Sequence, residues 1–237
     1  MAAMTCLASH RRTSVGVPPA PTFARRGFTL TELAVVLVIV ALLLGGLMLP
    51  LAAQQDIRNT AETQRTLGDA TEALLGYAAS HQAADGKPYL PCPDTDTVPD
   101  GIENRTGTAC TSPEGVLPWS DLGIGRQDAW GNHLRYRVAA AFSNSGTGFT
   151  LSSAGNLRIC TDATCTATVA TAVPAVVLSL GRNGASTTTD ADELENTDGD
   201  NDFVMRTQGG AGGYDDIVAW LGQNILFNRM ISAGRLP

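Results

Sequence analysis

The chain has 237 residues, 16% of them charged, and a formal net charge of −7. A chain of this length has room for one compact domain of about 150 residues beside a leader and a membrane segment. Binding to phosphate groups needs a basic face, so the acidic balance argues against nucleic acid as a partner.

Residues 1–24 are rich in Ala, Pro, Arg and Ser and show no hydrophobic periodicity. This composition predicts an unstructured leader. Arg25 and Arg26 follow it, and they stand directly before the most apolar stretch of the chain.

Residues 33–53 contain no charged side chain and consist largely of Leu, Val, Ile and Ala. About 20 such residues are needed for a helix to cross the hydrocarbon core of a bilayer. The next cationic residue after the run is Arg58, whereas two arginines precede it. The positive-inside bias therefore predicts a membrane helix with its N-terminus in the cytoplasm.

Glu32 stands at the entrance of this apolar run. A lone acid at mid-membrane costs roughly 2.5–3.5 kcal/mol on insertion scales, so the carboxylate needs a cationic partner. The sequence offers no Lys or Arg close enough downstream. Cleavage between Gly27 and Phe28 would supply a partner, because the new α-amino group would lie one helical turn from Glu32.

The stretch Arg-Gly-Phe-Thr-Leu-Thr-Glu at residues 26–32, with the apolar run behind it, resembles the class III signal of type IV pilins and type II secretion pseudopilins. The resemblance implies that a membrane-embedded prepilin peptidase cuts after Gly27 and N-methylates Phe28. It also implies that Glu32 pairs with the amine of a neighbouring subunit during filament assembly. Pro50 lies where the family often has a helix-kinking proline.

The expected division is a cleaved leader (1–27), a transmembrane and filament-core helix (28–53) and a periplasmic globular domain (54–237). Removal of the leader takes away four arginines and no acid, so the mature chain has 12 basic and 23 acidic residues and a net charge of −11.

Two other interpretations of the N-terminus remain. A secretory signal peptide needs a small-residue cleavage site after the apolar run. Ala52-Ala53 is the best candidate, but Pro50 and Leu51 interrupt the required pattern. A simple signal anchor would leave Glu32 snorkelling to the interface. Neither interpretation accounts for both the Gly-Phe pair before the run and the acid inside it.

Beyond Pro50 the pattern becomes amphipathic, which predicts one helix from about residue 28 to residue 80. No heptad repeat persists, so we expect the second half to pack on a sheet rather than in a coiled coil. The positions with helical apolar spacing are Ile57, Ala61, Leu67, Ala70, Leu74, Leu75 and Ala78.

Residues 84–122 contain six prolines, which exclude long regular structure. Cys92 and Cys110 bracket much of this loop, and Cys160 and Cys165 form a closer pair. Four cysteines in a periplasmic domain permit three disulfide pairings. We favour Cys92–Cys110 and Cys160–Cys165 because each closes a local loop. Zinc is the alternative, but the cysteine spacings do not fit a zinc site.

Short strands are expected in the remainder of the chain, separated by turns rich in Gly, Ser and Asn. Leu134, Tyr136 and Val138 alternate after a Trp-Gly-Asn turn. This segment, residues 128–136, resembles the Asp-Pro-Trp-Gly-Asn-Pro turn of major pseudopilins, with Ala129 and His133 in place of the prolines. The other expected elements are strands at 149–152, 157–160, 167–171, 175–180 and 217–221 and a helix at 224–231.

Residues 179–184 and 215–217 resemble two C-terminal landmarks of pseudopilins, between which that family binds calcium. The loop between them is long and acidic here. Asp198, Asp200 and Asp202 alternate along it, and such a spacing can converge oxygen ligands on Ca²⁺. A solvated acidic loop without metal is the alternative.

The chain lacks a Gly-x-Ser-x-Gly motif, a phosphate-binding loop and a His-Glu-x-x-His motif. Its mature histidines, His81 and His133, stand far apart, which suits acid–base chemistry poorly. We therefore expect no enzymatic activity, with a membrane-anchored hydrolase as the alternative.

Taken together, the residues and the resemblance predict a pilin-like α+β fold, with a long N-terminal helix packed on an antiparallel sheet. The expected function is that of a pseudopilin, a structural filament subunit polymerised from the inner membrane by a type II secretion-like machine. Its expected partners are prepilin peptidase, other pseudopilins and the inner-membrane assembly platform. The alternatives are a type IV minor pilin and a surface-binding or DNA-uptake subunit.

Overall fold

The computed structural model describes residues 27–184, 188–209 and 213–237, without the side chains of residues 46–52. The chain divides into two compact units, of which the first ends at Pro50 and the second covers Leu51–Pro237. Each unit is described by itself.

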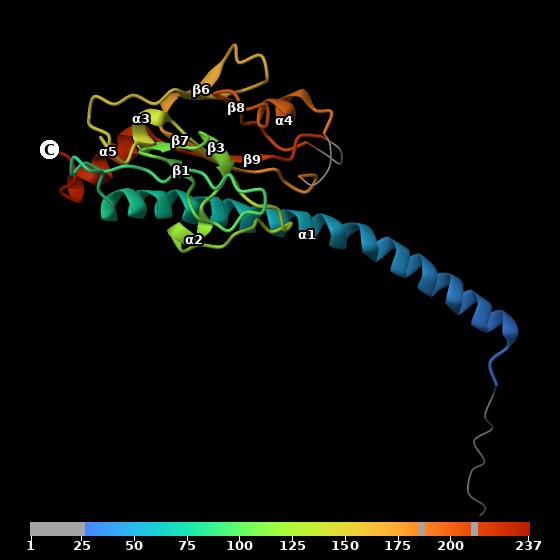
Figure 1. Cartoon of the computed structure of the whole chain (residues 1–237). Coiled ribbons are helices and arrows are strands. Elements are labelled where there is room, and N and C mark those ends of the chain that lie inside the picture. The colour runs from blue at the N-terminus through green and yellow to red at the C-terminus, as the bar shows by residue number, and fades with distance from the viewer. Residues whose placement is uncertain (1–26, 185–187, 210–212) are drawn as a thin grey trace, which may run out of the picture. The chain divides into compact units, whose positions relative to one another are not determined.

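Helices and strands follow the order expected for an α+β protein (Figure 1). The helices are α1 (Leu30–Ser80), α2 (Trp119–Leu122), α3 (Ala140–Ser143), α4 (Ala191–Glu195) and α5 (Gln223–Ser232). The strands are β1 (Arg105–Thr106), β2 (Ala109–Cys110), β3 (Glu114–Val116), β4 (Arg135–Val138), β5 (Leu157–Cys160), β6 (Thr168–Val173), β7 (Ala175–Ser179), β8 (Asp202–Val204) and β9 (Ile217–Leu221).

The strands form a four-stranded sheet of order β3-β4-β7-β9, a three-stranded sheet of order β6-β5-β8 and the small pair β1-β2. Every neighbour in the four-stranded sheet is antiparallel, which confirms the predicted α+β class. The three-stranded sheet departs from the prediction because β8 runs parallel to β5. A parallel neighbour requires a long crossover connection, and the chain between β5 and β8, which includes β6, β7 and α4, supplies it.

The second half of α1 packs on the four-stranded sheet along one stripe of its surface. The stripe begins at Thr63 and continues through Leu67, Ala70, Leu74 and Ala78, all of which are buried at helical spacing. These side chains share a core with residues of β4 and β7, which confirms packing on a sheet. The predicted inward positions Ile57 and Ala61 are exposed instead, because they precede the first buried turn.

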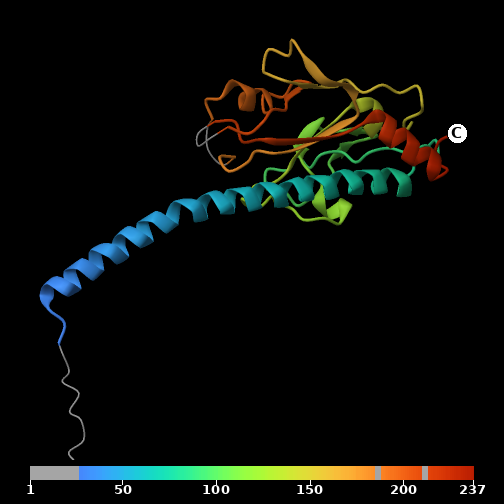
Figure 2. The same ribbon diagram turned by 180° about the vertical axis from the view of Figure 1, so that it is seen from behind.

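The C-terminal helix α5 lies beside the end of α1 (Figure 2). Arg229 of α5 forms an ion pair with Glu72 of α1 at 2.7 Å, and Arg235 Nε donates a hydrogen bond to the carbonyl oxygen of Ala79 at 2.6 Å. The end of the chain is thereby fixed against the long helix.

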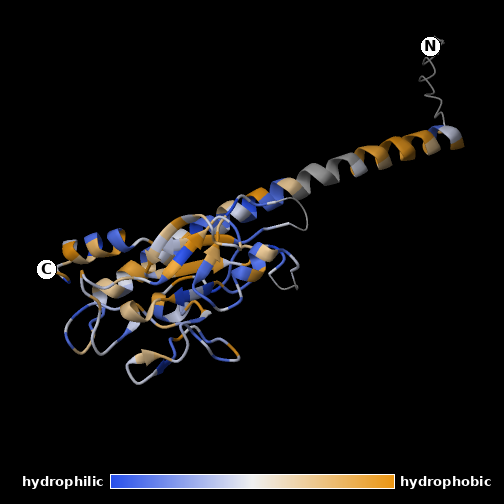
Figure 3. Cartoon of the chain, turned by 90° about the horizontal axis from the view of Figure 1, so that it is seen from above, coloured by the Kyte–Doolittle hydropathy of each residue, from blue (hydrophilic) through white to orange (hydrophobic). Residues whose placement is uncertain are grey.

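Strand β7 lies between two hydrophobic cores, which explains why all five of its residues are buried. Val177 belongs to the core under α1, whereas Val176 and Leu178 belong to a second core shared with the three-stranded sheet. Alternating side chains of one strand reach both cores because they point to opposite faces of the sheet. Coloured by hydropathy, the strands of this region carry the apolar residues and the surrounding loops the polar ones (Figure 3).

The predicted strand at residues 149–152 is wrong. These residues lie in a turn region, and Phe149 contributes its ring to the core instead. The ring centroids of Phe149 and Phe142 are 5.1 Å apart. The apolar residue therefore reflects burial of one side chain rather than a strand.

The structure places the four mature cysteines in the two local pairs. The Cα atoms of Cys92 and Cys110 are 5.2 Å apart, and those of Cys160 and Cys165 are 5.0 Å apart. Both separations fall within the range that a disulfide spans. The first bridge closes the Pro-rich loop, and the second closes the turn between β5 and β6.

Candidate functional site

The N-terminus of α1 is closed by reciprocal hydrogen bonds between Thr29 and Glu32. The backbone N–H of Thr29 donates to Glu32 Oε2 at 2.8 Å, and the backbone N–H of Glu32 donates to Thr29 Oγ1 at 3.2 Å. The Thr29 hydroxyl also donates to Glu32 Oε2 at 2.8 Å. This is a capping box, which satisfies amide groups that a helix start leaves without partners. The carboxylate is therefore oriented toward the N-terminal end of the helix.

Gly27 and Phe28 precede this cap in non-helical conformation. No atom lies within 4 Å of the position that a Cβ on Gly27 would take, and the side chain of Phe28 is 86% exposed. The predicted scissile bond is thus accessible, and Phe28 on its C-terminal side lies two residues before Leu30, the first residue of α1. The structure brings Gly27, Phe28 and Glu32 into one short segment.

The described side chains of α1 between Leu30 and Leu44 form an apolar surface that nothing in the first unit covers. Among the residues whose side chains are described, which leave out 46–52, no helix is both long enough and apolar enough to cross a membrane.

The acidic loop does not bring the three predicted calcium ligands together. Asp198 and Asp200 have carboxylate oxygens near that of Glu195, which the sequence analysis did not include. Asp202 instead binds the guanidinium of Arg158, whose Nε donates to Asp202 Oδ1 at 2.6 Å. The parallel register of β5 and β8 places these two residues opposite each other. The predicted set of ligands therefore needs correction at Asp202.

A second acidic cluster, Glu193–Asp215–Asp216, is more deeply enclosed. Glu193 lies on α4, and the two aspartates precede β9. Their carboxylate oxygens lie within 4.8 Å of one another, and Glu193 and Asp216 are each only 3% exposed. Three carboxylates this close repel one another strongly unless protons or a cation neutralise them.

Burial raises the pKa of Asp216 from its ordinary value of 3.8, a hydrogen bond from Asn196 opposes this shift, and the neighbouring charges of Glu193 and Asp215 add to it, so that the pKa is about 7. Burial and the charge of Glu193 also raise the pKa of Asp215. Asp215 Oδ1 is buried and has no hydrogen-bond partner among the described residues. The cluster therefore has both unbalanced charge and a free oxygen ligand.

Neutral amides hold the cluster in place. Asn196 Nδ2 donates to Asp216 Oδ2 at 2.8 Å, Asn183 Nδ2 donates to Glu193 Oε2 at 3.0 Å, and the backbone N–H of Asp215 donates to Glu193 Oε1 at 2.8 Å. Amide groups orient carboxylates without neutralising them. The carboxylate oxygens of Glu193, Asp215 and Asp216 are of the kind that Ca²⁺ prefers, so these three residues fit a calcium ion.

The two segments singled out in the sequence by their resemblance to pseudopilins touch each other beside this cluster. The Ser179 hydroxyl donates to Asp128 Oδ2 at 2.6 Å, and Asn132 Nδ2 donates to the carbonyl oxygen of Gly181 at 2.7 Å. Gly181 has a φ of +62°, and a Cβ there would collide with Asp215. The turn at residue 181 thus requires glycine for both conformation and space.

The sequence analysis missed Glu193, Asp215 and Asp216 as a cluster. Asp215 and Asp216 were recognised only as a landmark, and Glu193 stands 22 residues before Asp215. The alternating aspartates 198, 200 and 202 predicted a calcium site in a different part of the acidic loop. The sequence does contain one signal for the cluster, the pair Asp215-Asp216 directly before the apolar strand β9. A strand that begins in the core places the residues directly before it inside the domain.

Comparison with known proteins gives one family match. Residues 22–48 match the family described as the prokaryotic N-terminal methylation motif. No curated protein and no solved structure matches the chain. The match confirms the predicted class III signal, so the chain carries the prepilin-type N-terminal methylation signal of pilin-like proteins processed by prepilin peptidase.

Proposed function

We propose that this protein is a structural filament subunit, specifically a pseudopilin of a type II secretion-like machine. The observation that carries the proposal is the N-terminal methylation signal directly before an uncovered apolar helix, with Glu32 held at the helix start. An exposed apolar surface of this extent requires either lipid or other apolar helices around it. A subunit that moves from the membrane into a filament is surrounded first by lipid and then by the apolar helices of other subunits.

Residues 33–53 are proposed to anchor the subunit in the inner membrane before assembly, with the N-terminus in the cytoplasm and the second unit in the periplasm. Support comes from the absence of charge in this run and from the arginines before it. No nucleic-acid partner is proposed, because the chain without residues 1–27 has a net charge of −11.

Glu32 is proposed to guide assembly. The capping box directs its carboxylate toward the helix N-terminus, where cleavage after Gly27 creates an amine on Phe28. In an apolar environment, the amine of a neighbouring subunit is the cation that offsets this charge most directly. Apolar helices slide past one another easily, whereas such an ion pair fixes their register.

Contact between the two pseudopilin-like segments, through Asp128 and Ser179, favours a pseudopilin over a type IV minor pilin. The same contact shapes the turn beside the buried acidic cluster. We propose that Glu193, Asp215 and Asp216 bind Ca²⁺, which would neutralise their charge and connect α4 to the start of β9. Asp198 and Asp200 are proposed only as a weaker, exposed site with Glu195.

The first prediction separates assembly from processing. Glu32→Ala should still be cleaved after Gly27 and remain in the membrane, yet fail to enter filaments, because cleavage reads residues around Gly27. Sedimentation of sheared filaments and the mass of the membrane-extracted chain measure the two steps. Glu62→Ala is the matched control, since Glu62 lies exposed on the same helix. If Glu32→Ala assembles like the wild type, the carboxylate has no role in assembly.

A further inference from the structure

The two main sheets have four edges, and two of them are covered within the chain. At the edge formed by β3, the N–H of Val116 donates to the carbonyl oxygen of Asp94 at 2.8 Å, and the N–H of Asp94 donates back at 2.9 Å. At the edge formed by β8, the N–H of Val204 donates to Asn196 Oδ1 at 2.7 Å, and the Tyr214 hydroxyl donates to the carbonyl oxygen of Val204 at 2.6 Å. These edges are therefore closed to further strands.

The other two edges, β6 and β9, are open. In the part of the chain that the structure describes, β9 has backbone partners only in β7, and β6 only in β5. Every second residue of an edge strand turns its N–H and C=O groups outward. Neither strand contains a charged residue or a proline, two of the devices that protect such edges from pairing. The pairing of β9 with β7 is regular, whereas that of β6 with β5 has register shifts on both sides of Ile159.

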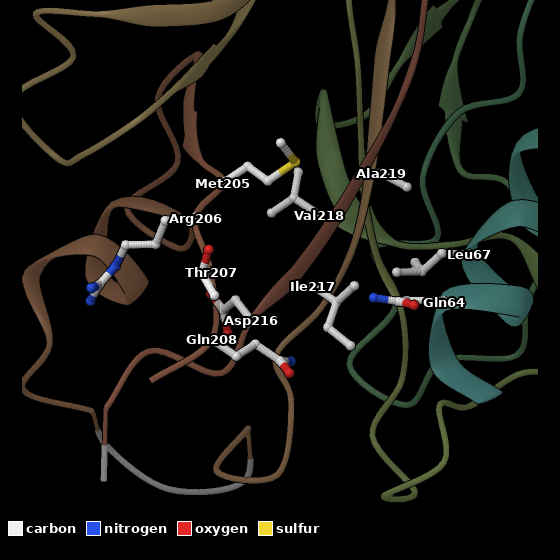
Figure 4. A pocket seen from close by; sticks show the side chains of 10 residues that line it. All are labelled: Gln64, Leu67, Met205, Arg206, Thr207, Gln208, Asp216, Ile217, Val218 and Ala219. Carbon is white, nitrogen blue, oxygen red and sulfur yellow. The ribbon is translucent and has the colours of Figure 1, made fainter. Parts of the chain in front are cut away.

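A groove of about 780 Å³ runs along the open edge of β9 (Figure 4). Its floor includes Val218 and Ala219, one wall is Leu67 of α1, and the opposite wall includes Met205. A strand placed beside β9 would point alternate side chains toward these two walls. The groove is thus shaped for an extended chain, with apolar side chains on both sides.

The groove offers no free cation among its described lining residues, and it contains the carboxylate of Asp216. Its one cationic residue, Arg206, forms ion pairs with Asp190 at 2.9 Å and with Asp192 at 2.6 Å. A strand with acidic side chains would therefore be repelled there. The best occupant is a strand without acidic residues, rich in small and β-branched side chains.

Strand β6 has this composition, Thr-Val-Ala-Thr-Ala-Val, and Val169 in it is 46% exposed. At about 3.3 Å per residue, β6 and β9 are of similar length, roughly 20 and 17 Å. The disulfide between Cys160 and Cys165 closes the turn that leads into β6. Figures 1 and 2 both show β6 on the side of the second unit facing away from α1, so it cannot reach the groove of its own chain.

We propose that β6 of one subunit adds as a strand to the open edge of β9 in a second copy of the chain. This contact uses two different surfaces, so it is heterologous and repeats from copy to copy rather than closing on itself. Peptide strands are commonly bound at sheet edges in this way. The inference rests on the proposed function, because it describes how the globular units of a filament would touch.

The test is cysteine cross-linking in membranes that contain the full chain, with copper phenanthroline as oxidant. A mixture of Val169→Cys and Ala219→Cys chains should give a covalent dimer, and the double variant should give a ladder of multimers. Leu151→Cys mixed with Ala219→Cys is the matched control, since Leu151 is 45% exposed and lies outside β6. We expect at least tenfold less dimer in the control. Thr207→Cys, on the groove wall, replaces Ala219→Cys if that variant does not accumulate.

The inference is overturned if Val169→Cys gives no more dimer than the Leu151→Cys control, or if Ala219→Cys chains cross-link only with one another, which would indicate a closed β9–β9 dimer. Filaments that form without the 169–219 cross-link overturn the inference and leave the proposed function intact. A cross-link without filaments supports the contact and contradicts the filament role. Val169→Glu should abolish the contact by placing a negative charge in the groove that Asp216 lines, whereas Leu151→Glu should not.

Discussion

The residues proposed to carry the function are single carboxylates, and their nearest hydrogen bonds orient them. The Thr29 hydroxyl and amide hold Glu32 at the helix start. Asp216 is buried beside Glu193 and Asp215, and among the described residues its carboxylate receives one hydrogen bond, from the neutral amide of Asn196. The first carboxylate is proposed to meet an amine, and the second a metal ion.

The second prediction concerns pH. Because the pKa of Asp216 is raised from 3.8 to about 7 by burial, the folded state favours the protonated form. Its contribution to stability is full below about pH 4 and is lost as the pH rises toward 7, by on the order of 4 kcal/mol. In the presence of chelator, Asp216→Asn should therefore gain stability relative to the wild type between pH 4 and 7, as measured by urea unfolding.

Ionisation of the cluster destabilises the wild-type domain when no metal is present. Calcium should stabilise the domain instead, because it binds the ionised carboxylates. At pH 7, millimolar Ca²⁺ should raise the melting temperature of the wild type and have little effect on Asp216→Asn. Asp202→Asn should keep the calcium response, since Asp202 already binds Arg158. A melting temperature that does not depend on Ca²⁺ contradicts the proposed site.

At the scale of elements, the second half of α1 and the four-stranded sheet form the main core. Leu74 lies fully buried in the middle of the stripe that faces this sheet. Ile57 lies on the same helix but outside that stripe. The two residues offer a direct comparison of a packed and an unpacked position.

The third prediction is that Leu74→Ala lowers the free energy of unfolding of the domain by about 2–5 kcal/mol, because it removes buried methyl groups and leaves a cavity. Ile57→Ala should change it by less than about 0.5 kcal/mol, since that side chain is 69% exposed. Chemical denaturation of the two variants measures both values. Equal effects would mean that α1 does not pack on the sheet along this stripe.

The fourth prediction concerns the Pro-rich loop. Loss of the Cys92–Cys110 bridge should cost about 2–4 kcal/mol, and Cys92→Ser paired with Cys110→Ser should make the loop sensitive to protease. Non-reducing peptide mapping of the wild type should recover the links 92–110 and 160–165. Free thiols or bound zinc in the purified domain would contradict both bridges.

Long periodic elements could be predicted from the sequence, and short paired ones could not. The helix ending at Ser80 and the strands β5, β7 and β9 follow from local apolar patterns. Strand β8 has three residues, and its parallel pairing depends on the distant β5. That pairing also places Asp202 against Arg158 and not beside Asp198 and Asp200. Residues that pair over a long sequence separation leave no local signal. The sequence therefore predicted calcium binding at the alternating aspartates and not at the buried cluster of Glu193, Asp215 and Asp216.

At the scale of the whole molecule, the mature chain combines an uncharged apolar segment with a strongly acidic remainder. The second unit, residues 51–237, has 12 basic and 22 acidic residues, and its net charge of −10 makes copies of it repel one another. Assembly must then depend on uncharged contacts and on the few ion pairs that link copies. The apolar face of α1, Glu32 with a neighbouring amine, and the open edges of β6 and β9 meet this need.

The central claim is that the chain is a processed filament subunit, and mass spectrometry of the membrane-extracted protein tests it most directly. We predict a mature chain that begins at N-methyl-Phe28, and an uncut precursor in Gly27→Leu, because a side chain at the scissile position obstructs the peptidase. An intact N-terminus in the wild type, or one that begins near Gln54, would contradict the account.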